Sequence, residues 1–247
     1  MKRLSPARSL ALSTWVFVLA APAMALAANV NTVDTLTQSE FRSLSEDLGA
    51  ALSYKPMIPS EPLGITGFDI GVAVTGTRLK NASVLSKASG NDSVSTTLYV
   101  PSLRAHKGLP FDIDIGVNYT AVPSTNLKLY GGELRWAVLA GSTVSPAVAV
   151  RVAINKVNGV DQLAFDTTSL DLSVSKGVLN LTPYAGVGQV WVKSTPKGSA
   201  ASFLSAEKFT QTKVYAGVNV NLGLNLDFEV DSTGGITSYG VKAGVRF

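Results

Sequence analysis

Apolar and polar residues alternate along most of the chain after residue 66. In residues 110–121, for example, Ile113, Ile115 and Val117 alternate with Asp114 and Gly116. Side chains of a β-strand point alternately to opposite faces, so this period of two predicts strands with one apolar and one polar face. Ten such segments follow one another: about 66–78, 95–105, 110–121, 127–139, 147–157, 164–175, 179–193, 211–222, 224–231 and 239–247.

The positions of the aromatic residues favour a membrane barrel over a soluble β-sandwich. On the apolar faces Tyr119, Tyr130 and Tyr239 fall toward one end of their strands, and Phe68, Phe111 and Phe247 toward the other. Transmembrane barrels carry aromatic girdles at both interfaces and an even number of strands. We therefore predict an all-β fold over residues 66–247, an antiparallel transmembrane β-barrel of about ten strands. A soluble periplasmic β-sandwich is the alternative fold.

The last segment, from Tyr239 to Phe247, alternates strictly and stops on an aromatic residue. It resembles the closing strand of bacterial outer-membrane β-barrels as a class, which often ends in Phe and is read by the assembly machinery. The resemblance implies insertion by the barrel assembly machinery. It also implies that Tyr239, Val241, Val245 and Phe247 carry the assembly signal.

The N-terminus has the pattern of a secretory signal peptide over residues 1–27. Lys2, Arg3 and Arg8 precede a short apolar core, and the small residues Ala25 and Ala27 precede the expected cleavage site. The core is too short to be a membrane-spanning helix. We therefore expect export and a mature chain that begins at Ala28, located in the outer membrane of a Gram-negative bacterium.

Residues 28–65 are expected to be a periplasmic leader, an amphipathic helix and a Pro-rich linker. Thr37 and Glu40 have the spacing of a capping box, and apolar residues follow at helical spacing, which predicts a helix over 38–53. The expected lumen wall is charged and offers little apolar surface against which the apolar stripe of this helix could be buried. We therefore predict that the helix docks outside the lumen, at the periplasmic mouth. The alternative is a plug inside the barrel.

Charge and composition exclude several functions. The formal net charge is +4, but Lys2, Arg3 and Arg8 supply three of these charges, so about +1 remains after cleavage. The sequence pI of about 9.2 is therefore no sign of nucleic-acid binding. The chain has no cysteine, which excludes disulfides and thiolate chemistry. The positive mean hydropathy, +0.25, with 15% charged residues suits a barrel in lipid.

The polar faces of the predicted strands concentrate charge in the lumen. Antiparallel pairing across the connection at 123–125 and across residues 140–146 would bring five residues into one mixed cluster: Asp112, Asp114, Glu133, Arg135 and Arg151. A structural ion-pair network is favoured over a solute path, because a barrel of this size has a narrow interior. Asp227, Glu229 and Asp231 form a row that could bind a cation, although pairing with Lys213 is favoured.

A second charged set lies at the predicted outer ends of the strands. Arg78, Lys128, Lys156 and Lys193, with Lys80 and Lys208 nearby, would form a ring at the height of lipopolysaccharide phosphates. Charge-assisted contacts to those phosphates are one interpretation, and solvated rim residues are the other.

The sequence favours a non-enzymatic protein, either structural or a narrow passive channel. Its one histidine, His106, falls in a predicted periplasmic turn, which places it badly for general-base chemistry. No cofactor, metal site or nucleic-acid partner is expected, and outer-membrane lipid and lipopolysaccharide are the expected partners. Binding or transport of a small apolar solute, with the helix as plug, is the alternative. A surface enzyme is the weakest.

Overall fold

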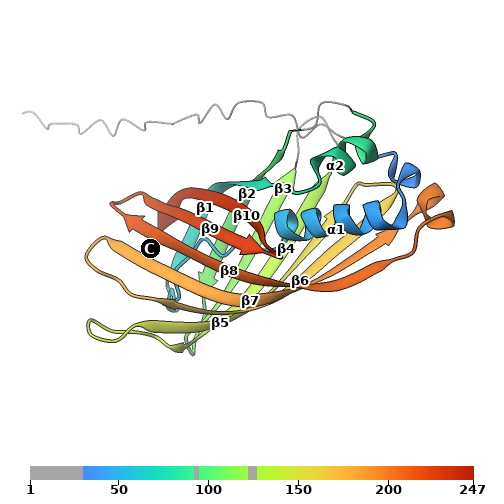
Figure 1. Ribbon diagram of the computed structural model, residues 1–247. Coiled ribbons are helices and arrows are strands. Elements are labelled where there is room, and N and C mark those ends of the chain that lie inside the picture. Colours follow the sequence, from blue (N-terminus) through green and yellow to red (C-terminus); the bar gives the residue numbers. More distant parts are fainter. Residues whose placement is uncertain (1–29, 92–94, 122–126) are drawn as a thin grey trace, which may run out of the picture.

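The computed structural model describes residues 30–91, 95–121 and 127–247. The predicted signal peptide, the predicted mature start at Ala28 and the connection at 123–125 lie outside the described residues. Within the described ranges ten strands close into one antiparallel barrel, with each strand paired to its sequence neighbours and β1 paired to β10 (Figure 1). The predicted fold class is confirmed.

The observed strands agree with the predicted ones apart from a few residues at their ends. Their bounds are β1 Phe68–Arg78, β2 Thr97–Gly108, β3 Ile113–Ala121, β4 Lys128–Leu139, β5 Ala147–Asn158, β6 Leu163–Ser175, β7 Leu181–Pro196, β8 Glu207–Asn221, β9 Asn225–Thr233 and β10 Ile236–Arg246.

The last residue closes the barrel. The Phe247 backbone N–H donates to the Phe68 carbonyl at 2.9 Å, and the Phe68 N–H donates to the Phe247 carbonyl at 3.2 Å. We call the end of the barrel that holds these two residues the terminal mouth, and the opposite end the distal mouth. The connections at the terminal mouth are 109–112, 140–146, 176–180 and 222–224. The longest connections, 79–96 and 197–206, lie at the distal mouth.

The barrel turns its apolar face outward. Val117, Leu134 and Val152 are 59%, 52% and 46% exposed, whereas the charged side chains of Asp114, Arg135 and Arg151 on the opposite face are fully buried. A soluble sheet protein would bury the apolar face instead. An outward apolar band around a polar lumen is the arrangement of a membrane barrel.

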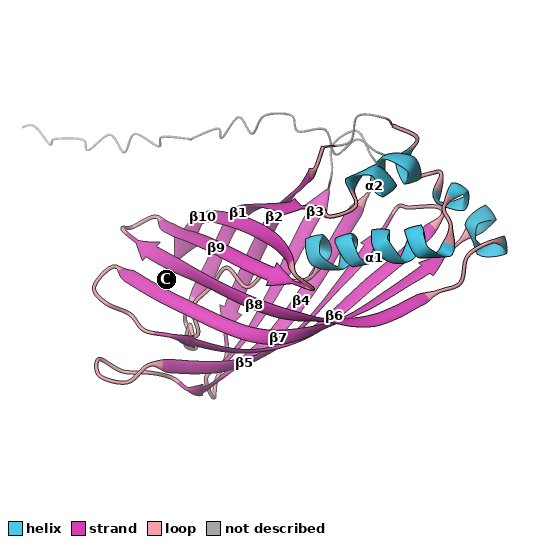
Figure 2. Ribbon diagram, viewed as in Figure 1, coloured by secondary structure: helices cyan, strands magenta, loops and turns pink. Residues whose placement is uncertain are grey.

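In the described ranges four helical segments accompany the strands: η1 Val33–Thr35, α1 Gln38–Leu52, α2 Ala82–Ser89 and η2 Gly198–Ser202. Figure 2 shows α2 at the mouth opposite the C-terminus, and η2 lies in the connection between β7 and β8 at the same mouth. The sequence predicted α1 but showed no sign of α2, which lies in the expected outer loop 80–94. In the described part of the chain no helix combines the length and apolarity needed to span a membrane.

The position predicted for the 38–53 helix is wrong. Instead of docking at the periplasmic mouth, α1 lies inside the barrel and packs against β1, β2, β7, β8, β9 and β10 (Figure 1). Residues 30–38 lie at the distal mouth, α1 runs inward from there, and residues 53–67 continue to Phe68 at the terminal mouth. Residues 30–67, which we call the lumen segment, therefore occupy the barrel along its length.

Candidate functional site: the occupied lumen

The start of α1 is fixed by the capping box that the sequence predicted. The Thr37 side-chain oxygen accepts from the Glu40 N–H at 3.3 Å, and the Glu40 carboxylate accepts from the Thr37 N–H at 2.7 Å. Lys87 of α2 donates to the same carboxylate at 2.8 and 2.9 Å. The hydrogen bond from Lys87, and then that from the Thr37 backbone, lower the pKa of Glu40 to about 2. Glu40 thus joins the start of α1 to α2 at the distal mouth.

The distal half of the lumen is apolar, which explains why α1 enters it. Phe41, Leu44 and Leu48 of α1 are at most 7% exposed. They belong to one cluster with inward-facing wall residues, which are Leu98, Val100, Leu129, Val157, Leu163, Phe165, Val190 and Val192. The stripe on α1 therefore buries against a matching wall, and this burial is the main favourable term for seating the helix.

The strand parity of the sequence places this apolar wall in the lumen, and the expectation of a charged lumen wall is therefore wrong for the distal half. Extending the parity of β5 from Arg151 through Asn155 places Val157 inward. The parity of β7, ambiguous in the sequence, is resolved in the same way. Val190 and Val192 face α1, and Gln189 faces outward and bonds to Thr212 at 3.2 Å. The alternation in β5 and in β7 is regular once their inward apolar residues are matched to a helix in the lumen.

Between α1 and the terminal mouth, charged side chains hold the lumen segment to the barrel wall. The Lys55 ammonium donates to Asp231 at 2.8 Å, to the Ala50 carbonyl at 2.8 Å and to Ser238 at 3.2 Å, so its three protons are all used. Arg104 of β2 donates to the Lys55 carbonyl and lies over the Tyr54 ring, 4.8 Å from its centroid. Backbone and side chain of Lys55 are thus both bound to the wall.

Met57, further toward the terminal mouth, is also held by the barrel wall. Its backbone N–H donates to Glu229 at 2.8 Å, and its side chain is buried beside Gly240 of β10. A Cβ atom on Gly240 would lie 2.1 Å from the Met57 methyl carbon, so a larger residue there would displace this side chain. The glycine makes room in the wall for the lumen segment.

Near the terminal mouth the segment is bound by β3, β4 and β6. The Leu63 N–H donates to Asp114 at 3.0 Å, and the Ser60 N–H donates to Ser175 at 2.8 Å. Arg135 donates to the Pro59 carbonyl and pairs with Asp114 at 2.7 Å. Wall residues thereby satisfy buried backbone groups of this extended stretch, as burial requires.

Four of the five residues predicted for the lumen cluster are brought together. Besides the Arg135–Asp114 pair, Arg151 pairs with Glu133 at 2.7 Å, and all four side chains are fully buried. Asp112 is the exception: it is exposed in the 109–112 turn with a φ of 57°, because β3 begins only at Ile113. It does not reach the lumen.

The predicted position of His106 is also wrong. β2 extends to Gly108, so His106 faces the lumen and is buried rather than lying in a turn. Its Nε2 lies 3.2 Å from the Tyr54 hydroxyl and 3.2 Å from the Glu133 carboxylate. His106 therefore belongs to the network that holds the lumen segment. Its neighbour Gly108 favours a turn in the sequence, but it is the last residue of β2.

The acidic row of β9 pairs with cations, but not with Lys213 as predicted. Asp227 pairs with Lys242 at 3.0 Å and Asp231 with Lys55, whereas Lys213 pairs with Asp171 at 3.0 Å. Glu229 accepts from Met57 and, at 3.1 Å, from the Tyr184 hydroxyl. Among the described residues no group of three or more His, Cys, Asp or Glu is arranged to hold a metal.

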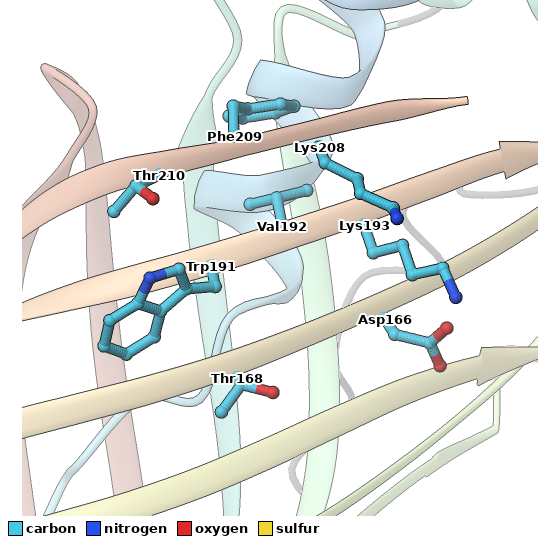
Figure 3. A pocket seen from close by; sticks show the side chains of 8 residues that line it. All are labelled: Asp166, Thr168, Trp191, Val192, Lys193, Lys208, Phe209 and Thr210. Atoms are coloured by element: carbon cyan, nitrogen blue, oxygen red, sulfur yellow. The ribbon is translucent and has the colours of Figure 1, made fainter. Parts of the chain in front are cut away.

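The predicted basic residues lie exposed at the distal ends of their strands: Arg78, Lys128, Lys156 and Lys193, with Lys80 and Lys208. Lys193 and Lys208 face each other across β7 and β8, and their ammonium groups point the same way as the Asp166 carboxylate (Figure 3). Trp191 lies on the same outward face, toward the terminal mouth. Val192 points the other way, toward α1. Like charges directly opposite each other are unfavourable unless an anion lies between them.

The predicted assembly residues all face outward on β10 and the chain end. Tyr239, Val241, Val245 and Phe247 are 56%, 48%, 40% and 79% exposed. They form one continuous apolar ridge beside the seam where β10 meets β1.

Comparison with known proteins gives likeness of fold only. No protein-family model and no curated protein matches the sequence. Among solved structures, the N-terminal β-barrel domain of Pseudomonas aeruginosa OprF matches with 15% identity and a TM-score of 0.35, over 72% of this chain and 99% of that one. Ail, the attachment invasion locus protein of Yersinia pestis, matches with 12% identity and a TM-score of 0.32, over 74% and 99%. Neisserial surface protein A matches with 12% identity and a TM-score of 0.29, over 73% and 95%.

The fold is that of the bacterial outer-membrane β-barrels: ten strands in the described ranges, a closed sheet, an apolar exterior and an interior that holds the buried charges. In this chain the lumen segment occupies that interior.

Proposed function

We propose that this protein is a non-enzymatic outer-membrane barrel that its own lumen segment keeps closed, so that its role is structural rather than that of an open channel. The observation that carries the proposal is the continuity of the lumen segment from distal to terminal mouth. Apolar packing holds its helix, and buried polar contacts hold residues 54–63. The narrow interior of a barrel of this size leaves little space beside it.

The expected location and assembly form part of the same proposal. The signal-peptide pattern supports export, and the outward apolar band supports insertion into the outer membrane. The ridge from Tyr239 to Phe247 supports recognition by the barrel assembly machinery, because it is exposed beside the strand pair that closes the barrel. Lipopolysaccharide is the proposed lipid partner, since Lys193 and Lys208 are exposed neighbours just beyond the apolar band.

The enzyme alternative finds little support in the geometry. His106 is the only histidine of the sequence, and its side chain is fully enclosed between Tyr54 and Glu133. A substrate would have to displace the lumen segment before reaching it. General-base catalysis requires the base to lie within hydrogen-bond distance of the reacting group, and here protein groups occupy those positions.

Transport of a small apolar solute remains the second candidate, and one observation favours it. If α1 left the barrel, the wall residues Leu129, Val157 and Phe165 would line an apolar cavity in the distal half. Such a surface suits an apolar ligand. This function requires the lumen segment to move, whereas the structural role requires it to stay.

Conductance across a planar bilayer tests the proposal. The refolded wild-type protein should give no sustained current, and deletion of residues 30–60 should give open channels. Because the deletion removes partners of the wall charges and the barrel could fail to fold, a point variant that weakens seating, Gly240→Leu, provides a second route. Sustained wild-type current would contradict the structural role. Solute uptake by the wild type, lost when the segment is cross-linked to the wall, would favour transport.

A further inference from the structure

The described chain begins at the distal mouth and is fastened there. The Thr32 N–H donates to the Ala88 carbonyl at 3.0 Å, and the Thr32 hydroxyl donates to the Lys87 carbonyl at 2.7 Å. Val30 is buried, at 6% exposure, in the apolar cluster of the distal half, whereas Asn31 is exposed. The first described residues are therefore a fixed part of this mouth.

Contacts to two further distal connections support this placement. Asp34 accepts from Ser199 of η2 at 2.7 Å, and its N–H donates to Gln162 at 3.3 Å. Gln38 exchanges hydrogen bonds with the Ser205 backbone at 2.9 and 3.2 Å. Together with α2, three separate connections at one end of the barrel hold residues 32–38.

The C-terminus lies at the other end. From Gln38 the chain descends through the lumen and reaches Phe68, which pairs with Phe247 at the terminal mouth. Figure 1 shows the C-terminus and the α2 end on opposite sides of the barrel. In outer-membrane barrels the strand ends joined by short turns face the periplasm and the longer loops face outward. The terminal mouth fits the first description and the distal mouth the second.

We propose that the chain crosses the outer membrane once through its own barrel, so that Asn31 stands on the external face. This inference rests on the proposed outer-membrane location.

The placement also sets an order of assembly. Export delivers the N-terminal part of the chain to the periplasm first, yet residues 30–38 end at the external mouth. We expect them to enter before β1 and β10 pair, because a closed barrel leaves no lateral way in. Both α1 and the extended stretch 53–67 stay in the lumen after that passage.

The chain has no cysteine, so single cysteines report topology directly. Three exposed positions are compared in cells: Asn31→Cys, Ser202→Cys in η2 at the distal mouth, and Thr143→Cys at the terminal mouth. A membrane-impermeant maleimide is applied to intact cells and to cells with a permeabilised outer membrane. Positions 31 and 202 should label in intact cells, and position 143 only after permeabilisation.

The other results overturn the inference in distinguishable ways. If position 202 labels in intact cells but position 31 needs permeabilisation, the N-terminal side is periplasmic and this inference fails alone. If position 143 labels in intact cells and positions 31 and 202 do not, the barrel is inverted and the inference fails as well. If all three need permeabilisation, the outer-membrane proposal fails with it. Heat-modifiable migration on gels shows that each variant has folded.

Discussion

Lys55 of the lumen segment and Asp231 of β9 form an ion pair of 2.8 Å, with side chains that are 5% and 3% exposed. A buried pair is costly to form, but removing one partner leaves an uncompensated charge and typically costs about 3–5 kcal/mol. The pair therefore does more to fix the register of the lumen segment than to add stability.

Lys55→Met should lower the free energy of unfolding by about 3 kcal/mol or more, because Asp231 stays buried without its cation. Urea titration of protein refolded in lipid vesicles measures this. The double variant Lys55→Met, Asp231→Leu should recover most of the loss. Lys87→Met is the matched control, since the Lys87–Glu40 pair is 43% and 30% exposed, and water screens and solvates a charge left behind there. Equal losses in the two single variants would contradict this.

Gly240→Leu should unseat the lumen segment, because its Cβ would meet the Met57 methyl carbon at 2.1 Å and the rest of the leucine would need the space of that buried side chain. We expect intermittent channel openings in planar bilayers, absent from the wild type. Gly132→Leu is the control: on β4 the nearest atom to an added Cβ is 3.7 Å away, so the change should leave the barrel closed. Silence in both variants would show that Met57 adapts without loss of seating.

Val152→Arg should destabilise the barrel by about 2–4 kcal/mol if its side chain faces the lipid midplane. Asn158→Arg, on the same outward face of β5 but at its distal end, should cost little, because it lies among the rim residues. Urea titration in vesicles compares the two. If both cost the same, the outward face of β5 does not lie in lipid.

The Glu40 contact should respond to acid. Its folded pKa is lowered to about 2, so its contribution to stability is complete above the ordinary carboxyl pKa and is lost as pH falls toward 2. Carboxyl carbon NMR of the folded protein should show Glu40 still ionised at about pH 3, between the lowered and the ordinary pKa. Lys87→Met should raise its pKa, because the largest cause of the shift is the Lys87 hydrogen bond. An ordinary Glu40 titration in the wild type would contradict the contact.

Phe247→Asp should reduce the folded yield in cells while leaving stability in detergent nearly unchanged, because this side chain is 79% exposed and buries little. Phe203→Asp, also exposed at 75% but in the distal connection, controls for loss of an exposed aromatic. Heat-modifiable outer-membrane protein is quantified for both. Normal accumulation of the Phe247 variant would mean that the terminal aromatic has no part in assembly.

Strict alternation made the barrel predictable, because the period of two alone separates the outward face from the lumen face. The Arg135–Asp114 and Arg151–Glu133 pairs follow from that parity and from antiparallel register. The prediction for Asp112 is wrong because this residue lies in a turn with positive φ and β3 starts only at Ile113. The alternation of apolar and polar residues continues through the turn and gives no sign of it.

The place of the lumen segment was harder to predict, because it depends on where apolar residues face inward. The inward-facing residues of β5 include Arg151 in its middle and Val157 near its distal end. A lumen wall inferred from the charged middle of the strands therefore omits the apolar distal part. The contacts of Lys55, Met57 and Pro59 join positions more than 70 residues apart in sequence, and no local pattern announces them.

The central claim, that residues 30–67 run through the lumen from distal to terminal mouth, is tested most directly by distances between spin labels on the purified, folded protein. Asn31→Cys is paired once with Ser202→Cys and once with Thr143→Cys in the cysteine-free chain. The account predicts a short distance from position 31 to position 202. It predicts a distance to position 143 that is longer by about the 30 Å thickness of a bilayer core. The reverse order, with position 31 close to position 143, would contradict it.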